Sequence, residues 1–146
     1  MNFSRPAAVI TGASAGLGAE YALKLAEKGA HSLVLVARRA DRLMELKARI
    51  EREFGYRADA GASDGPIVLV VVADLTNGED RERMLKAIEA AGLDVELLIN
   101  NAGFGSVGEF CALPTERELA MVELNVKALV HLTSHFVRRW AGSKTS

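Results

Sequence analysis

The stretch Thr11-Gly12-Ala13-Ser14-Ala15-Gly16-Leu17-Gly18 decides the fold of this chain, because it joins an apolar run to an amphipathic segment. The preceding residues, Ala7 to Thr11, do not alternate between polar and apolar, which predicts a strand buried on both faces. A phosphate can approach the backbone N–H groups of a helix start only if no Cβ blocks the turn. The spacing therefore predicts that Gly12 makes the tight turn, Gly16 permits a close approach and Gly18 lets the helix pack on the sheet. The alternative is an ordinary glycine-rich turn that binds nothing.

Short apolar runs and longer amphipathic stretches continue to alternate along the rest of the chain. The predicted strands are residues 7–11, 32–37, 67–73 and 95–100. The predicted helices are 16–28, 39–54, one that begins at 77 or 78 and ends at 91, and 115–140, with loops at 58–66 and 103–108. This alternation is typical of an α/β, Rossmann-type doubly wound parallel sheet with helices on both faces. We expect one domain over residues 1–146, with a frayed polar tail at residues 142–146.

The composition excludes several classes of protein. Of 146 residues, 49% are hydrophobic and the formal net charge is −1, which argues against a disordered chain and against nucleic acid as a partner. The apolar run from Ile67 to Ala73 is too short to span a membrane. The single cysteine, Cys111, excludes an internal disulfide, fits a reducing compartment and predicts a cytoplasmic location. His131 and His135 lie four residues apart without a third ligand at recognisable spacing, so we expect no metal site.

The Gly-x-x-x-Gly-x-Gly spacing resembles that of the short-chain dehydrogenase/reductase family, whose members carry Thr-Gly-x-x-x-Gly-x-Gly after the first strand. Three further elements support the resemblance in the right order: Asp74-Leu75 after the third strand, Asn100-Asn101-Ala102-Gly103 after the fourth, and Asn125 in the last helix. The resemblance covers essentially the whole chain. It implies a nicotinamide dinucleotide as cofactor and hydride transfer between a small carbonyl or alcohol substrate and that cofactor.

The resemblance also implies roles for individual residues. Asp74 and Leu75 would contact the adenine, Asn125 would distort its helix and hold a water in a proton relay to a catalytic lysine, and the cofactor would further contact Gly12, Ser14, Ala15, Gly16, Leu17, Gly18, Asn101, Ala102 and Gly103. The residues leave simpler alternatives open. Asp74 can cap the next turn, the two asparagines can serve turn chemistry, and Asn125 can be a buried amide that is only structural.

The end of the second strand favours NADP(H) over NAD(H). NAD-selective sites place an acidic residue there to bind the ribose 2′-OH, whereas this chain has Ala37 followed by Arg38 and Arg39. A guanidinium suits a 2′-phosphate. NADP-type members of the family often carry a second basic residue before the second glycine, where this chain has Ala15. The alternative is that both arginines are solvated residues at a helix start.

The catalytic residues that the resemblance calls for are missing. The family uses a Ser, a Tyr and a Lys four residues after the Tyr, whereas Tyr21 and Tyr56 both precede the fourth strand and no Tyr-x-x-x-Lys occurs. The sequence therefore resembles an N-terminal, cofactor-binding part, truncated after the fourth strand and the following helix, and we expect it to be catalytically incomplete. Residues 104–110 are expected to form one wall of the substrate pocket.

The last predicted helix, residues 115–140, is apolar on more than one side, with Val122, Val126, Leu129, Phe136 and Trp140 in one set and Leu124, Ala128 and Leu132 in another. One side should cover the sheet, and the other suggests homo-oligomerisation, as in the family, or coverage by further chain. Residues 95–99 should then form an exposed sheet edge. Beside the oxidoreductase part, the sequence permits a non-catalytic nucleotide-binding or interaction module that pairs through this helix. A chain that does not fold stably is the third possibility.

Overall fold

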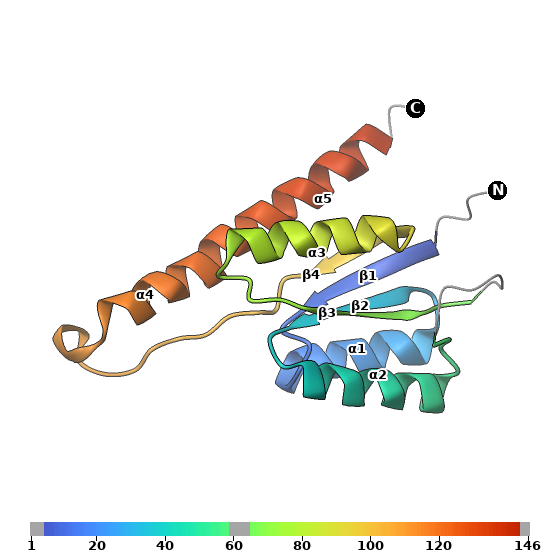
Figure 1. Ribbon diagram of the computed structural model, residues 1–146, viewed down its shortest axis with the longest axis horizontal. Helices are drawn as coiled ribbons and strands as arrows, with labels where there is room; N and C mark the ends of the chain where they lie inside the picture. Colours follow the sequence, from blue (N-terminus) through green and yellow to red (C-terminus); the bar gives the residue numbers. More distant parts are fainter. Residues whose placement is uncertain (1–4, 59–64, 144–146) are drawn as a thin grey trace.

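A parallel four-stranded sheet in the order β3-β2-β1-β4 forms the centre of the molecule (Figure 1). The computed structural model describes residues 5–58 and 65–143. The strands are β1 (Arg5–Thr11), β2 (Ser32–Ala37), β3 (Val68–Val72) and β4 (Leu93–Ile99). The helices are α1 (Gly16–Lys28), α2 (Ala40–Phe54), α3 (Gly78–Ala90), α4 (Thr115–Val122) and α5 (Leu129–Ser143), with a 3-10 turn at Phe110–Ala112 and a π-helical turn at Glu123–Ala128.

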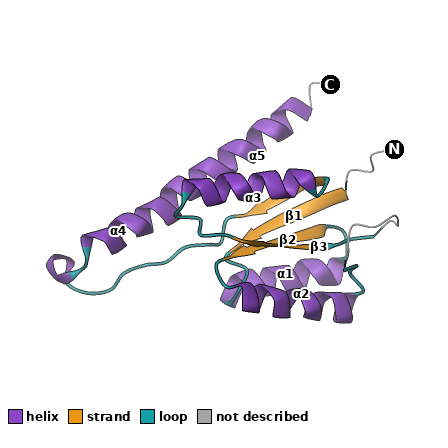
Figure 2. Ribbon diagram, in the orientation of Figure 1, coloured by secondary structure: helices purple, strands orange, loops and turns teal. Residues whose placement is uncertain are grey.

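Helices cover both faces of the sheet (Figure 2), which confirms the predicted doubly wound fold. Successive side chains of β1 point to opposite faces. Ala8 and Ile10 enter the core under α1 and α2, whereas Ala7 and Val9 enter the core under α3 and α5. All four of these side chains are fully buried.

Burial on both faces, which a doubly wound sheet leads one to expect for every strand, holds for β2 but not for β3 and β4. All six residues of β2 are buried, because the strand has neighbours on both sides and helices above and below. Val72 of β3 is 42% exposed, and β4 alternates between buried and exposed residues over its first half. Both strands are edges of the described sheet, and β4 is the edge that the sequence predicts.

The element boundaries agree with the prediction to within three residues. Arg39 caps α2 instead of starting it, and β4 begins at Leu93, two residues early. The last helix continues to Ser143, so Gly142 and Ser143 are helical, and the remainder of the predicted tail, 144–146, lies outside the described residues. Most of the predicted loop 58–66 also lies outside them.

The last helix presents different sides from those that the sequence predicts. Phe136 and Trp140 cover the sheet together with Ala128 and Leu132, and the Trp140 indole N–H donates to the carbonyl of Val95. The exposed apolar residues are Leu119, Val122, Val126, Leu129, Val130 and Val137. The prediction assumed 3.6 residues per turn throughout, whereas the π-helical turn is wider and rotates everything after it. Beyond the sheet, α4 projects past the carboxyl ends of the strands (Figure 1).

Candidate functional site

A cavity of about 460 Å³ lies at the carboxyl ends of the strands. This is where open α/β sheets bind ligands, and the volume is in the range of small-molecule sites. The structure brings most of the predicted site residues together as its lining: Gly12, Ser14, Ala15, Arg38, Arg39, Asp74, Leu75, Asn101, Ala102 and Gly103. Gly16, Leu17 and Gly18 lie next to this lining in the chain without being part of it.

The three glycines of the first turn meet different surroundings. A Cβ on Gly12, at φ +66°, would lie 2.9 Å from the Ala102 Cα, and a Cβ on Gly18 would collide with the Gly12 carbonyl and lie 2.6 Å from the Asn101 Nδ2. Glycine is thus required at both positions, because the turn, α1 and the loop after β4 pack too closely for a side chain. Gly16, at φ +56°, has no atom within 4 Å of its Cβ position, and Leu17 beside it is 67% exposed. The start of α1 therefore presents open backbone that a ligand can approach.

Thr11 joins the first turn to the loop after β4. Its buried hydroxyl accepts hydrogen bonds from the Asn101 N–H at 3.0 Å and the Ala102 N–H at 2.9 Å, and donates to the Ile99 carbonyl at 3.3 Å. The Asn101 amide donates back to the carbonyls of Thr11 and Gly12. The predicted site did not include Thr11. Its position as a hydroxyl at the end of a buried strand was the available signal.

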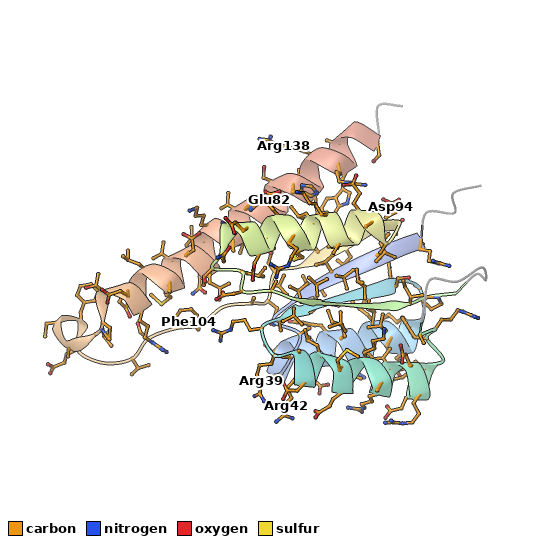
Figure 3. The ribbon with its side chains drawn as sticks, viewed as in Figure 1. Arg39, Arg42, Glu82, Asp94, Phe104 and Arg138 are labelled. Carbon is orange, nitrogen blue, oxygen red and sulfur yellow. The ribbon has the colours of Figure 1, made fainter. Side chains whose placement is uncertain are left out.

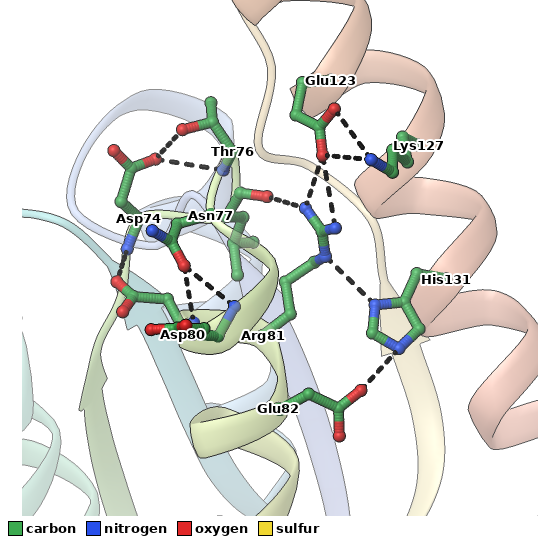
Figure 4. A network of polar contacts seen from close by, with 11 residues as sticks. Asp74, Thr76, Asn77, Asp80, Arg81, Glu82, Glu123, Lys127 and His131 are labelled. Atoms are coloured by element: carbon green, nitrogen blue, oxygen red, sulfur yellow. Dashed lines mark hydrogen bonds and ion pairs between the residues drawn. The ribbon is translucent and has the colours of Figure 1, made fainter.

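Asp74 caps the turn after β3, as the simpler alternative predicts. Its Oδ1 accepts from the Thr76 N–H at 3.0 Å and the Thr76 hydroxyl at 2.7 Å, and its own N–H donates to the Asp80 Oδ2 at 2.7 Å (Figure 4). This last bond, with a hydrogen bond from Arg83, lowers the pKa of Asp80 below its ordinary value. Within the described residues the Asp74 Oδ2 has no hydrogen-bond partner, so capping leaves one oxygen for a ligand.

Arg38 and Arg39 line the cavity but differ in their partners. Arg39 donates to the Asp41 carboxylate at 3.1 Å, and this hydrogen bond lowers the pKa of Asp41. Figure 3 shows Arg39 at the start of α2. Arg38 is exposed and makes no hydrogen bond or ion pair with its side chain among residues 5–58 and 65–143. Arg38 is therefore the cation of this pair that is free to bind an anion.

Asn125 is exposed, which corrects the expectation of a buried amide. Its Oδ1 accepts from the Phe104 N–H at 3.1 Å, and its Nδ2 donates to the Phe104 carbonyl at 2.8 Å. These two bonds satisfy the amide and fix the loop after β4. Asn125 lies in the π-helical turn, so the helix is distorted where the resemblance implies a distortion.

Phe104 and Arg117 form the side of the cavity nearest α4. The Arg117 guanidinium lies 5.4 Å from the centre of the Phe104 ring, a cation–π contact that the sequence did not predict. In the predicted wall at 104–110, Phe104 lines the cavity, whereas Val107 and Phe110 are 98% and 81% exposed. Beyond Phe104, the loop runs alongside α4 and away from the sheet, so its later residues leave the cavity (Figure 3).

Other kinds of site find little support in the described part of the chain. It contains no group of three or more His, Cys, Asp or Glu side chains that could hold a metal. None of its helices combines the length and the apolar character that crossing a bilayer requires. Cys111 is exposed, and His131 is hydrogen-bonded to Arg81.

The sequence is similar to that of a known protein family. The sequence matches the family model described as short chain dehydrogenase over residues 6–146. It is 31% identical over 141 residues to the dehydrogenase/reductase SDR family protein 7-like of Dictyostelium discoideum, covering 95% of this chain and 42% of that protein.

Two solved structures are similar in fold. A 7beta-hydroxysteroid dehydrogenase is 28% identical with a TM-score of 0.81, covering 94% of this chain and 48% of that one. A short-chain dehydrogenase from Sphingobium yanoikuyae, in complex with NADPH, is 37% identical with a TM-score of 0.79, covering 94% of this chain and 49% of that one. The chain thus spans about half the length of these relatives.

Proposed function

The chain belongs to the short-chain dehydrogenase family, and we propose that it is the NADP(H)-binding part of an oxidoreductase acting on a small carbonyl or alcohol substrate. The observation that carries this proposal is the cavity at the carboxyl ends of the strands. It combines open backbone at the start of α1 with a guanidinium, Arg38, that has no side-chain partner in the described part of the chain.

The residues present fit a dinucleotide. The backbone around Ser14 and Gly16 would bind the pyrophosphate, since a Cβ at Gly16 would meet no protein atom and the helix start favours negative charge. The free Asp74 Oδ2 would accept from the adenine amino group, and Asn101 to Gly103 would lie beside the ribose. Arg38 would bind the 2′-phosphate. When bound, the nicotinamide would supply or accept the hydride.

The chain's own contribution ends at binding and positioning. The sequence contains no Tyr-x-x-x-Lys, so the general acid or base that exchanges a proton with the substrate would come from residues outside this sequence or from another chain. Asn125 would support the proton relay by keeping the helix distorted and the Phe104 backbone fixed. We expect this chain to bind cofactor without turnover, and we place it in the cytoplasm on the strength of its single cysteine.

A non-catalytic module that pairs through its last helix is the second candidate. The exposed apolar residues of α4, the π-helical turn and α5 favour it, among them Leu119, Val126 and Val130. Both candidates bind nucleotide, and they separate on whether a Tyr-x-x-x-Lys segment is joined to this chain or supplied by a partner.

Titration of the chain with NADPH and NADH tests the proposal. The nicotinamide fluorescence of NADPH should change saturably, and NADPH should bind more tightly than NADH because only NADPH carries the phosphate for Arg38. Equal affinities would contradict the cofactor preference and leave the glycine turn in place. Absence of binding to either nucleotide, with the chain shown to be folded by circular dichroism, would overturn the proposal.

A further inference from the structure

Arg81 is the one charged residue that is buried among residues 5–58 and 65–143, with 4% of its surface exposed. Its guanidinium donates to the Leu75 carbonyl at 2.6 Å, to the Glu123 Oε1 at 3.3 Å and to the His131 Nδ1 at 3.0 Å (Figure 4). A buried guanidinium is costly unless its donors are satisfied. Here the acceptors come from three places: the turn after β3, the π-helical turn and α5.

The two sides of the cavity that Arg81 connects share one apolar core, in which Leu75 is buried and against which Leu124 packs, but their hydrogen bonds are largely separate. We call Asp74 and Leu75 the adenine-side wall. This wall has its own hydrogen bonds, from Thr76 to Asp74 and from Asp74 to Asp80. The Asn77 Oδ1 also caps α3 by accepting from the N–H groups of Glu79 and Asp80. The adenine-side wall should therefore keep its shape without Arg81.

The opposite side, which we call the helix-side wall, consists of Phe104 and Leu124. Asn125 holds the Phe104 backbone, and both Leu124 and Asn125 belong to the π-helical turn that begins at Glu123. In the described residues, the polar contacts from α3 to this turn and to α5 are those of Arg81 and a 3.2 Å contact between Glu82 and His131. Apolar packing of α3 against α5 holds the two walls together, and Arg81 supplies most of the directional, polar contacts between α3 and the helix-side wall.

We propose that Arg81 is a positioning residue that sets the spacing of the two walls of the cavity, so that a ligand touching both walls binds more tightly than one touching the adenine-side wall alone. The inference rests on the proposed function, in which the adenine lies against Asp74, and it adds that the nicotinamide end extends toward Phe104, which lines the same cavity. Arg81 itself touches neither end and acts through Leu75 and Glu123.

Substitution Arg81→Met tests this by comparing two ligands. NADPH spans both walls, whereas adenosine 2′,5′-bisphosphate carries only the adenosine half and the phosphate that Arg38 would bind. We expect NADPH to bind about tenfold more weakly to the variant, a typical size for energetic coupling, with the affinity for the bisphosphate unchanged. Lys86→Met is the matched control, because it removes one positive charge from the exposed side of α3 and should leave both affinities unchanged.

Glu123 provides a second pair of variants if Arg81→Met does not fold. Glu123→Ala removes the acceptor and should weaken NADPH selectively. Glu123→Gln keeps an acceptor oxygen for Arg81 and should restore part of the affinity. Urea unfolding of each variant gives the folded fraction, so that lost protein is not counted as lost affinity.

The outcomes separate this inference from the proposed function. Equal weakening of both ligands in Arg81→Met, or an unchanged affinity for NADPH, overturns the inference while the unaltered chain still binds. An unaltered, folded chain that binds neither ligand overturns the proposed function and this inference with it.

Discussion

At the scale of single residues, the side chains around the cavity fall into two groups: those whose hydrogen bonds hold its loops in place, and those that leave a polar group without a partner. Thr11, Asn101 and Asn125 form hydrogen bonds with the backbone of the loops around the cavity. Arg38 and the second oxygen of Asp74 have no such partner in the described part of the chain. The free groups are the ones that a ligand can use, and of these the cation at Arg38 gives the sharpest test.

Arg38→Ala should weaken NADPH roughly 10- to 100-fold, the loss of one or two charge-assisted hydrogen bonds, and leave NADH unchanged. Arg42→Ala is the matched control, since Arg42 is an exposed arginine in the first turn of α2, the helix that follows Arg38 (Figure 3). Its guanidinium pairs with Glu45 at 3.5 Å. Competition titrations measure both affinities. An equal loss for NADPH and NADH would contradict a contact with the 2′-phosphate.

At the scale of elements, the junction where α3 meets the end of β3 and the π-helical turn contains two ionisable carboxylates, Asp80 and Glu123. The Asp74 N–H and Arg83 lower the pKa of Asp80. Burial raises the pKa of Glu123, but hydrogen bonds from Lys127 and Arg81 outweigh it and lower the pKa overall. Both groups hold their charge more readily in the folded chain than in the unfolded one, which links stability to pH at this junction.

The lowered pKa values of Asp80 and Glu123 make the stability of the chain depend on pH in the acid range. Because both folded-state pKa values are lowered, the stabilisation is complete above the unfolded carboxyl pKa, about 4, and is lost as the pH falls through the lowered values. The free energy of unfolding, measured in urea, should therefore decrease as the pH is lowered below about 4. Asp80→Asn should reduce this dependence, whereas Asp94→Asn, at an exposed position in β4, should preserve it. The same reduction in both variants would argue against a special role for Asp80.

At the scale of the whole molecule, the sheet and its helices form a closed core, whereas α4 stands outside it. Phe136 and Trp140 pack α5 onto β4, and the aromatic rings of the two stack at 6.2 Å. Leu119 and Val126 are 64% and 54% exposed on the projecting part. Apolar area of this kind marks an interaction surface or a place that further chain covers.

If two copies pair through this surface, the chain should sediment as a dimer at micromolar concentration, and Val126→Glu should shift it to monomer. Val107→Glu is the control, because Val107 is 98% exposed in the preceding loop. A monomer at every concentration for the unaltered chain would contradict pairing through the last helix. Thermal melts of the variants show whether the chain stays folded after the charge is added.

The sequence by itself determined the doubly wound fold, the strand–glycine–helix turn and the polar residues that follow the strands. These features depend on local periodicity and on the absence of a Cβ at a turn, which are properties of neighbouring residues. The carboxyl ends of parallel strands share one edge of a sheet, so the same pattern also placed most of the cavity lining. The sequence also predicted the edge at β4, whereas the edge at β3 needed the strand order.

Only the tertiary structure decided which groups are paired and which are free. Arg81 lies in a run of charged residues, 79–83, and is nevertheless buried because Glu123 and His131, 42 and 50 positions away, reach it. The π-helical turn changed the sides of the last helix, since one wider turn rotates all later residues. Both effects arise from contacts between segments far apart in the sequence, where periodicity carries no information.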